Sequence, residues 1–179
     1  KYKNGGGCVM GVLKIITKSE ADTDYLLNCF NYVIGGHTVS GCVGGINVYP
    51  LQAFMQMMNV KRYFGKTSGN QLVHFIISLD NKVFDPEVAL HIAYEIAKYY
   101  GDRYQIIFGV HQNPRINRKG RATSYVHIHM IMNSVSFVDG KMYADNKGAN
   151  YAFADHIKRI TDDYNWKVVY GTSVADEED

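Results

Sequence analysis

The sequence predicts an α/β two-layer sandwich, in which helices cover a mainly antiparallel sheet of about five strands. Strand-like and helical segments follow one another along the whole chain, in the order β-α-α-β-α-β-β-α-β. An Asp-Gly pair follows the longest strand pattern, and such pairs form the turns that join antiparallel neighbours. A chain of 179 residues with 46% hydrophobic content can bury one core but leaves little room for two domains.

The first half of the chain predicts a strand, two helices and a second strand. The first strand is rich in β-branched residues, and the second is too apolar for an edge strand, as in a strand buried on both faces. A capping residue precedes the first helix and a glycine pair ends it, whereas Pro50 opens the second helix and Gly65 ends it. The elements are expected over 9–16, from Asp22 or Thr23 to Gly35-Gly36, over 51–64 and over 72–79.

The second half predicts a helix, two strands, a further helix and a short last strand. Asp85-Pro86-Glu87 is a strong helix start, because aspartate caps, proline suits the first position and glutamate lies at the positive end of the dipole. Residues 112–123 are polar and basic and are expected to form a long loop. Asp139-Gly140 is expected to form a hairpin turn. The elements are expected from Asp85 to Tyr100, and over 104–110, 124–137, 151–164 and 167–170.

One domain is expected over residues 10–172, with a flexible leader over 1–9 and an acidic tail over 173–179. No apolar run approaches the ~20 residues that cross a bilayer, and the start lacks the apolar segment of a signal peptide. Three cysteines without Cys-x-x-Cys spacing fit a reducing compartment, so a cytoplasmic location is expected. The net charge of +2 neither requires nor excludes nucleic acid, so any basic surface must be local.

Two histidines share one face of the predicted strand over 124–137. Side chains alternate between faces, so His127, His129 and Asn133 point the same way. Two imidazoles about 7 Å apart along a strand can chelate one ion. His111 ends the preceding strand and falls beside them if the two strands pair antiparallel. Three neutral imidazoles suit a divalent metal that also binds a substrate.

An isolated His-x-His pair is common on strands that bind no metal, so a second observation is needed, and basic residues near the histidines provide it. Clusters of basic residues and tyrosines bind phosphates, with bases stacking on the tyrosine rings, although a basic loop can also be merely solvated. The loop that adjoins the histidines carries Arg115, Arg118, Lys119 and Arg121. A second, mixed cluster consists of Lys61, Arg62, Tyr63 and Lys66.

Five segments, in family order, resemble the relaxase/mobilisation nuclease domain of the MobP type, a branch of the HUH endonucleases. HUH denotes histidine, hydrophobic residue, histidine, which here is His127-Ile128-His129. The resemblance covers about Val12 to Tyr143. Residues 26–33 are similar to the helix that carries the family's tyrosine, and residues 43–47 to the glycine-containing stretch that follows it. Residues 73–78 match a strand with the sequence HFIIS. The other two segments are 101–105 and 127–137, the latter with Asp139-Gly140-Lys141.

The resemblance implies DNA strand transfer. Such proteins nick one strand at an origin of transfer on a plasmid or integrative conjugative element, and a tyrosine stays joined to the 5′ end. Carried onto this chain, it implies Tyr32 as the nucleophile and His111, His127 and His129 as ligands of Mg²⁺ or Mn²⁺. It also implies single-stranded or hairpin DNA, a relaxosome accessory protein and a type IV secretion coupling protein as partners, in the bacterial cytoplasm.

The sequence departs from the family in two ways. Members commonly space the ligands H-x7-H-x-H with an aspartate two residues after the first, whereas this chain has H-x15-H-x-H and Asn113. Asparagine cannot accept the tyrosine proton, so His74 is a candidate for that assistance, or else a hydrogen-bonded core histidine. Asn113 and Asn133 are candidates for contacts that support the ligands. Tyr25, two turns before Tyr32, is the alternative nucleophile.

Two other functions stay open at this stage. A replication-initiator or transposase HUH nuclease has the same fold, but usually places its tyrosine helix after the HUH strand rather than before it. A non-catalytic DNA-binding accessory protein that retains a structural metal would fit the asparagine at position 113.

Overall fold

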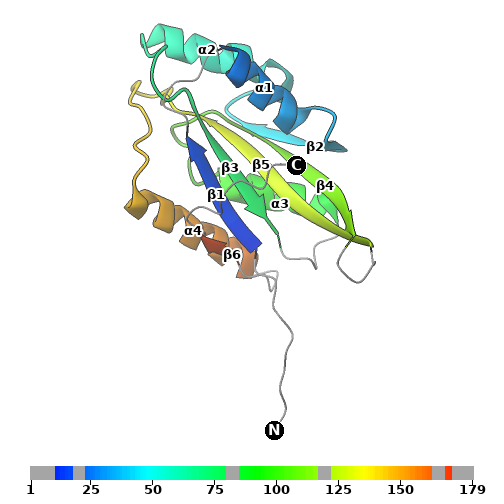
Figure 1. Cartoon of the computed structure of the whole chain (residues 1–179). Helices are drawn as coiled ribbons and strands as arrows, with labels where there is room; N and C mark the ends of the chain where they lie inside the picture. The colour runs from blue at the N-terminus through cyan, green and yellow to red at the C-terminus, as the bar shows by residue number, and fades with distance from the viewer. Residues whose placement is uncertain (1–10, 18–22, 80–84, 117–121, 163–167, 171–179) are drawn as a thin grey trace.

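A six-stranded sheet forms the centre of the computed structural model, which describes residues 11–17, 23–79, 85–116, 122–162 and 168–170 (Figure 1). The strand order is β2-β4-β5-β3-β1-β6. The first five strands in sequence pair antiparallel, and β6 runs parallel to β1. The strands are β1 (Gly11–Thr17), β2 (Thr38–Ile46), β3 (Leu72–Ser78), β4 (Ile106–Ile116), β5 (Ala122–Asn133) and β6 (Val168–Tyr170). The predicted sandwich of helices on an antiparallel sheet is confirmed, with the HUH strand β5 in its interior, and helices on both faces give it three layers rather than two.

Helices cover both faces of this sheet. Figure 1 shows α1 and α2 over one face and α3 on the other, where α4 packs against α3. The helices are α1 (Thr23–Ile34), α2 (Ala53–Tyr63), α3 (Pro86–Ala97) and α4 (Lys147–Asp162), and the 3₁₀ turn η1 (Pro50–Gln52) leads into α2. No helix among these residues is long and apolar enough to cross a bilayer.

The alternation along β5 sorts the core into two clusters. Even-numbered residues such as Ile128 and Met130 are fully buried and pack with the apolar faces of α3 and α4. Ile131, on the odd-numbered face, packs with Ile107 of β4 and with apolar residues of α1 and α2. The odd-numbered face also carries the histidines, so α1 and α2 cover the side of the sheet that holds the candidate site.

Several boundaries differ from the prediction. The strand β2 was not predicted, and part of the expected loop over 112–123 continues β4 to Ile116 and begins β5 at Ala122. The longest predicted strand ends at Asn133 rather than at 137, because the Asn133 side chain accepts from the Val135 backbone and turns the chain. The last helix begins four residues early, at Lys147. The predicted leader and acidic tail lie outside the described residues.

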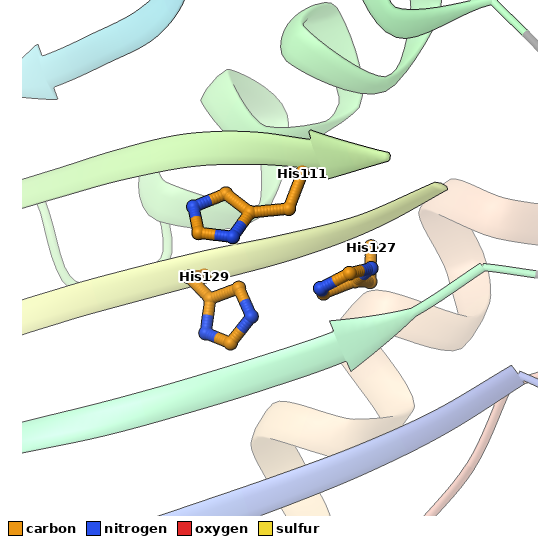
Figure 2. A group of neighbouring side chains, drawn as sticks. All are labelled: His111, His127 and His129. Carbon is orange, nitrogen blue, oxygen red and sulfur yellow. The ribbon is translucent and has the colours of Figure 1, made fainter. Parts of the chain in front are cut away.

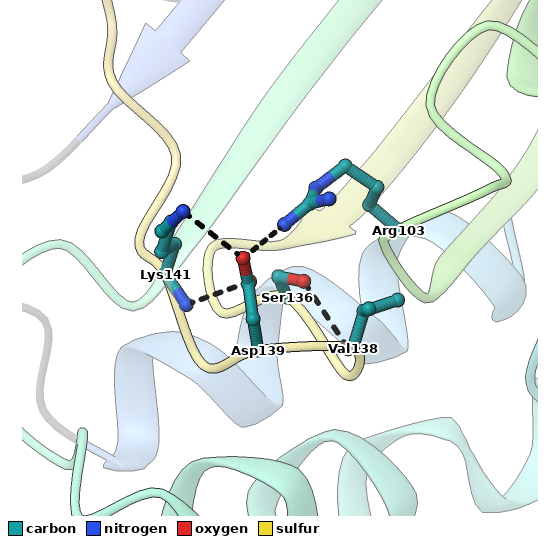
Figure 3. Close-up of polar contacts among 5 residues, drawn as sticks. All are labelled: Arg103, Ser136, Val138, Asp139 and Lys141. Carbon is teal, nitrogen blue, oxygen red and sulfur yellow. Dashed lines mark hydrogen bonds and ion pairs between the residues drawn. The ribbon is translucent and has the colours of Figure 1, made fainter.

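The predicted turn at Asp139-Gly140 packs against the end of α2. Asp139 lies 2.5 Å from Arg103 and 3.4 Å from Lys141, and it also accepts from the Lys141 backbone (Figure 3). The neighbouring guanidinium of Arg103 holds the pKa of the Asp139 carboxyl well below its usual range. Gly140 has φ 69°, and a side chain there would also meet the ring of Phe64.

Candidate metal centre

Three buried histidines converge on the α1 side of the sheet. His111 of β4 lies directly opposite His127 of β5 in the antiparallel register, and His129 follows on the same face. One nitrogen from each ring lies within 4.8 Å of the others. Figure 2 shows the three rings gathered over β4 and β5. This spacing and donor set fit one divalent metal ion with positions left for a substrate.

The end of α1 approaches the sheet closely beside these rings. Gly109 of β4 pairs with His129, and a Cβ atom on Gly109 would lie 2.0 Å from the carbonyl oxygen of Val33. Any side chain at this position would therefore push the helix away. Because Gly109 has no side chain, the last turn of α1, which carries Tyr32, can lie close to the histidines.

Tyr32 contacts two of the three histidines. Its ring centre lies 4.9 Å from that of His129 and 5.1 Å from that of His111. The side chain is 41% exposed, so the ring reaches solvent as well as the site. Tyr25, the alternative nucleophile, packs instead against the cluster between α1 and α2, where burial and a hydrogen bond with Cys29 raise its pKa to about 12.

A threonine fixes which nitrogen His111 presents. The Thr38 hydroxyl donates to the carbonyl of Val33 at 2.8 Å, and its oxygen lies 3.2 Å from Nε2 of His111. A hydroxyl has one proton, so here it accepts from the Nε2–H of His111. The lone pair is then on Nδ1, a buried atom without a hydrogen-bond partner among the described residues.

A hydrogen bond between two rings holds His129 against His74. Nε2 of His74 lies 3.0 Å from Nδ1 of His129, and Nε2 of His129 is buried without a partner in the described part of the chain. Burial, helped by His111 and Lys14, lowers the pKa of His74 to about 4. Burial is also the main cause that lowers the pKa of His129 and of His111. The imidazoles are therefore neutral near pH 7, the form that binds metals.

A family model described as relaxase, MobA/VirD2-like, nuclease domain, matches residues 32–166, most of the chain. The chain belongs to this relaxase family. The match begins at Tyr32 and contains all three converging histidines, and it confirms the resemblance found in the sequence. A search of curated proteins and a search of solved structures found no match. Family membership makes the chain a relaxase-type nuclease.

The other predicted site residues of this relaxase lie apart from the histidines or outside the described side chains. Asn133 donates to Gln105 and to the carbonyl of Met57 and accepts from Lys61, and it lies four residues along β5 from His129. The contacts of Asn133 therefore hold the buried Lys61 rather than the three histidines. The backbones of Asn113 and Arg115, on β4, pair with β5 within the hairpin. Their side chains are not among those described. Arg118, Lys119 and Arg121 lie outside the described residues.

Two further residues of the relaxase site were missed in the sequence. Thr38 lies on the unpredicted strand β2, opposite His111. The exposed His37 has its ring centre 5.7 Å from that of Tyr32 and 6.5 Å from that of His111. Their position just after the Gly35-Gly36 helix end was the available signal, because the residues that follow a helix C-terminus lie near its last turn.

Proposed function

We propose that this relaxase-family chain nicks one strand of DNA at an origin of transfer and rejoins it later, which starts the transfer of a conjugative plasmid or integrative element. The observation that carries the proposal is the contact of the Tyr32 ring with His111 and His129. A phenol beside a cluster of three imidazoles suits metal-assisted attack on a phosphodiester. The family match supports the nuclease class.

In this proposal, Nδ1 of His111 and Nε2 of His129, together with His127, would hold Mg²⁺ or Mn²⁺, which would supply positive charge for the scissile phosphate. The Tyr32 hydroxyl gives up its proton as its oxygen forms a bond to phosphorus. The bond from phosphorus to the 3′ oxygen breaks, and that oxygen gains a proton to become the free 3′-OH. The phosphotyrosine keeps the phosphodiester's free energy, so the reverse attack by a 3′-OH rejoins the strand without ATP.

The surrounding residues hold these groups in place. His74 orients His129 through the hydrogen bond between the two rings, and Thr38 orients His111. The proposed substrate is single-stranded or hairpin DNA, which the basic β4–β5 loop contacts. An accessory protein of the relaxosome and a type IV secretion coupling protein complete the proposed set of partners, in the cytoplasm of a bacterium. The proposed domain spans residues 10–172.

A covalent-adduct assay tests the nucleophile. Labelled single-stranded oligonucleotides that tile the DNA flanking the gene are incubated with Mn²⁺ and the protein, and SDS-resistant adducts are counted. Tyr32→Phe removes one oxygen and keeps the ring, so we expect no adduct and single-strand binding within a few fold of wild type. Tyr25→Phe is the matched control and should form adducts normally. Adducts formed by Tyr32→Phe at the wild-type level would overturn the assignment.

Calorimetry with Mn²⁺ tests the metal ligands. His127→Ala or His129→Ala removes one of the three proposed protein ligands, so we expect metal affinity to fall and cleavage to stop. The melting temperature without metal should change little beyond the loss of packing, because the two apolar clusters stabilise the fold. Unchanged Mn²⁺ affinity in both variants would contradict the metal centre.

A further inference from the structure

The end of α2 presents an aromatic ring and basic side chains that the proposed chemistry does not use. Tyr63 is 83% exposed, and Arg62 and Lys66 are exposed beside it. Lys61, which the sequence grouped with them, is 2% exposed and donates to the carbonyl of Gln71 and to Asn133 instead. The cluster on the surface therefore consists of one accessible ring and two cations.

Exposed apolar side chains continue from this cluster along the helix. Tyr49 is 72%, Leu51 91% and Met55 54% exposed. Leu51, Met55 and Tyr63 are separated by four and eight residues, so they follow one side of η1 and α2. Single exposed apolar residues are ordinary, but a row of them is typical of an interaction surface. We call Tyr49, Leu51, Met55, Arg62, Tyr63 and Lys66 the α2 surface.

The charge around the α2 surface favours a polyanion. Residues 25–79, which include η1, α2, β2, β3 and all of α1 except its first two residues, contain no aspartate or glutamate, and the acidic residue of α1 is Asp24 at its start. The turn at Gly140, which packs against Phe64, brings the exposed Lys141 near the same helix end. The acidic Asp139 of that turn is already paired with Arg103 and Lys141.

Accessible tyrosine rings beside cations are the features that bind single strands, since rings stack on bases and cations contact phosphates. An acidic protein would satisfy the cations, but it would leave two widely exposed tyrosine rings without the flat faces that they can stack on. We propose that the α2 surface binds single-stranded DNA outside the scissile position. The inference rests on the proposed function, because it assigns further contacts to the same substrate.

The distance between the α2 surface and the histidines indicates which part of the DNA strand this surface binds. Lys61 ties the end of α2 to Asn133, which lies four positions along β5 from His129 and six from His127. At about 3.3 Å per position this is roughly 13 to 20 Å. Both places lie on the face that α1 and α2 cover. A DNA strand whose scissile phosphate lies at the histidines can therefore contact the α2 surface with nucleotides that are several positions away from that phosphate.

Binding to two oligonucleotides tests the inference. The short one covers only the scissile position, and the long one extends it on both sides. The variant Arg62→Gln/Tyr63→Ala/Lys66→Gln should bind the long oligonucleotide about tenfold or more weakly, because it can no longer stack one base or neutralise two phosphates. Its salt dependence should fall by about 1.4, at about 0.7 per phosphate. Affinity for the short oligonucleotide and its cleavage should stay as in wild type.

Two controls define the result. Tyr63→Phe keeps the ring and should keep the affinity for the long oligonucleotide. Tyr151→Ala/Lys158→Gln/Arg159→Gln makes the same kind of change on exposed residues of α4, over the opposite face, and should have no effect.

Two outcomes would overturn the inference. If the α2 triple variant bound the long oligonucleotide with wild-type affinity and an unchanged salt slope, the α2 surface would not bind DNA, and a protein would be the expected partner. Equal wild-type affinity for both oligonucleotides would show that no binding occurs beyond the scissile position. If the wild-type protein cut neither oligonucleotide, the proposed function would fail and the inference with it, so the two failures are distinguishable.

Discussion

At the scale of single residues, one hydroxyl connects the predicted nucleophile's helix to a predicted metal ligand. Thr38 donates to Val33, the residue after Tyr32, and accepts from His111. The same side chain thus holds the end of α1 and selects the tautomer of a ligand. Such supporting hydrogen bonds commonly change metal affinity by roughly 10- to 100-fold when removed.

Thr38→Val tests this connection, because valine keeps the shape and removes the hydroxyl. The Nε2–H of His111 then keeps only the Val33 carbonyl, at 3.4 Å. We expect the affinity for Mn²⁺, measured by calorimetry, to fall roughly tenfold or more. Thr38→Ser restores the hydroxyl and should restore most of the affinity. Wild-type affinity in the valine variant would mean that the tautomer of His111 is fixed by the backbone alone.

The sequence predicted the three histidines because strand alternation and antiparallel pairing are geometric rules. These rules placed His127 and His129 on one face, and the register confirms that His111 lies opposite His127. The contacts of Thr38 and His37 could not be predicted in this way. They depend on how α1 is seated on the sheet, and that seating is set by Gly109 and Val33, which no local pattern connects.

At the scale of elements, the seating of α1 on β4 is the contact that places Tyr32. Gly109→Ala would put a methyl group 2.0 Å from the Val33 carbonyl, so the helix end or the strand must move. We expect a loss of about 1–3 kcal/mol in the free energy of unfolding. We also expect slower adduct formation, because Tyr32 shifts away from His129.

Gly36→Ala is the matched control for this substitution. It adds the same methyl group one residue beyond the Gly35 that follows α1, at a position with nothing within 4 Å. Urea denaturation and the adduct rate should both stay close to wild type. An adduct rate in Gly109→Ala equal to that of Gly36→Ala would show that the position of α1 does not govern the reaction.

The buried Lys61 anchors α2 and makes stability depend on pH. Burial lowers its pKa from 10.5 to about 7. Below pH 7 both the folded and unfolded states hold the proton, and the full cost of burying the charge is present. Between about pH 7 and 10.5 the unfolded state binds more protons, so the free energy of unfolding rises with pH, by up to about 1.4 kcal/mol per unit.

Urea denaturation between pH 7 and pH 10 measures this rise. Lys61→Met removes the titrating group and should remove this part of the pH dependence, whereas Lys66→Met, at an exposed lysine of the same segment, should retain it. A wild-type slope in Lys61→Met would show that another group causes the rise.

Elements with a clear period were predicted, and those without one were not. β2 reads TVSGCVGGI, and its three glycines remove the alternation of apolar side chains that marks a strand. Gly41 has φ 79°, and the register with β4 shifts between Thr38 and Val43. The outer part of the β4–β5 hairpin is polar and basic, so it was interpreted as a loop although its backbone pairs to Ile116.

At the scale of the whole molecule, charge differs between the two sides of the sheet. On the side covered by α1 and α2, the two helices carry one acidic residue, Asp24, whereas α3 and α4 carry Glu87, Glu95, Asp155 and Asp162. A net charge of +2 therefore conceals a side suited to a polyanion and a side that is not. Composition alone could not predict this separation, because it depends on which helices share a face.

The basic β4–β5 loop should add to the favourable side. Arg115, Arg118, Lys119 and Arg121 follow His111 and precede His127 in the sequence, in the segment that joins the two strands carrying these proposed metal ligands. Changing all four to glutamine should weaken binding to every single-stranded sequence alike, if the loop contacts only phosphates. The salt slope should then fall by about 0.7 for each phosphate that is no longer neutralised, measured by fluorescence anisotropy over a range of salt concentrations.

The matched control for this loop neutralises four basic residues of the opposite side, Lys98, Lys147, Lys158 and Arg159, which changes the net charge equally. If long-range attraction by net charge governed binding, the two quadruple variants would lose affinity alike. If direct contacts govern it, only the loop variant loses affinity and salt dependence, and this is the result we expect. A larger loss on the cognate origin than on a scrambled oligonucleotide would show that the loop also reads bases. Unchanged affinity and salt dependence in the loop variant would show that the loop is only solvated.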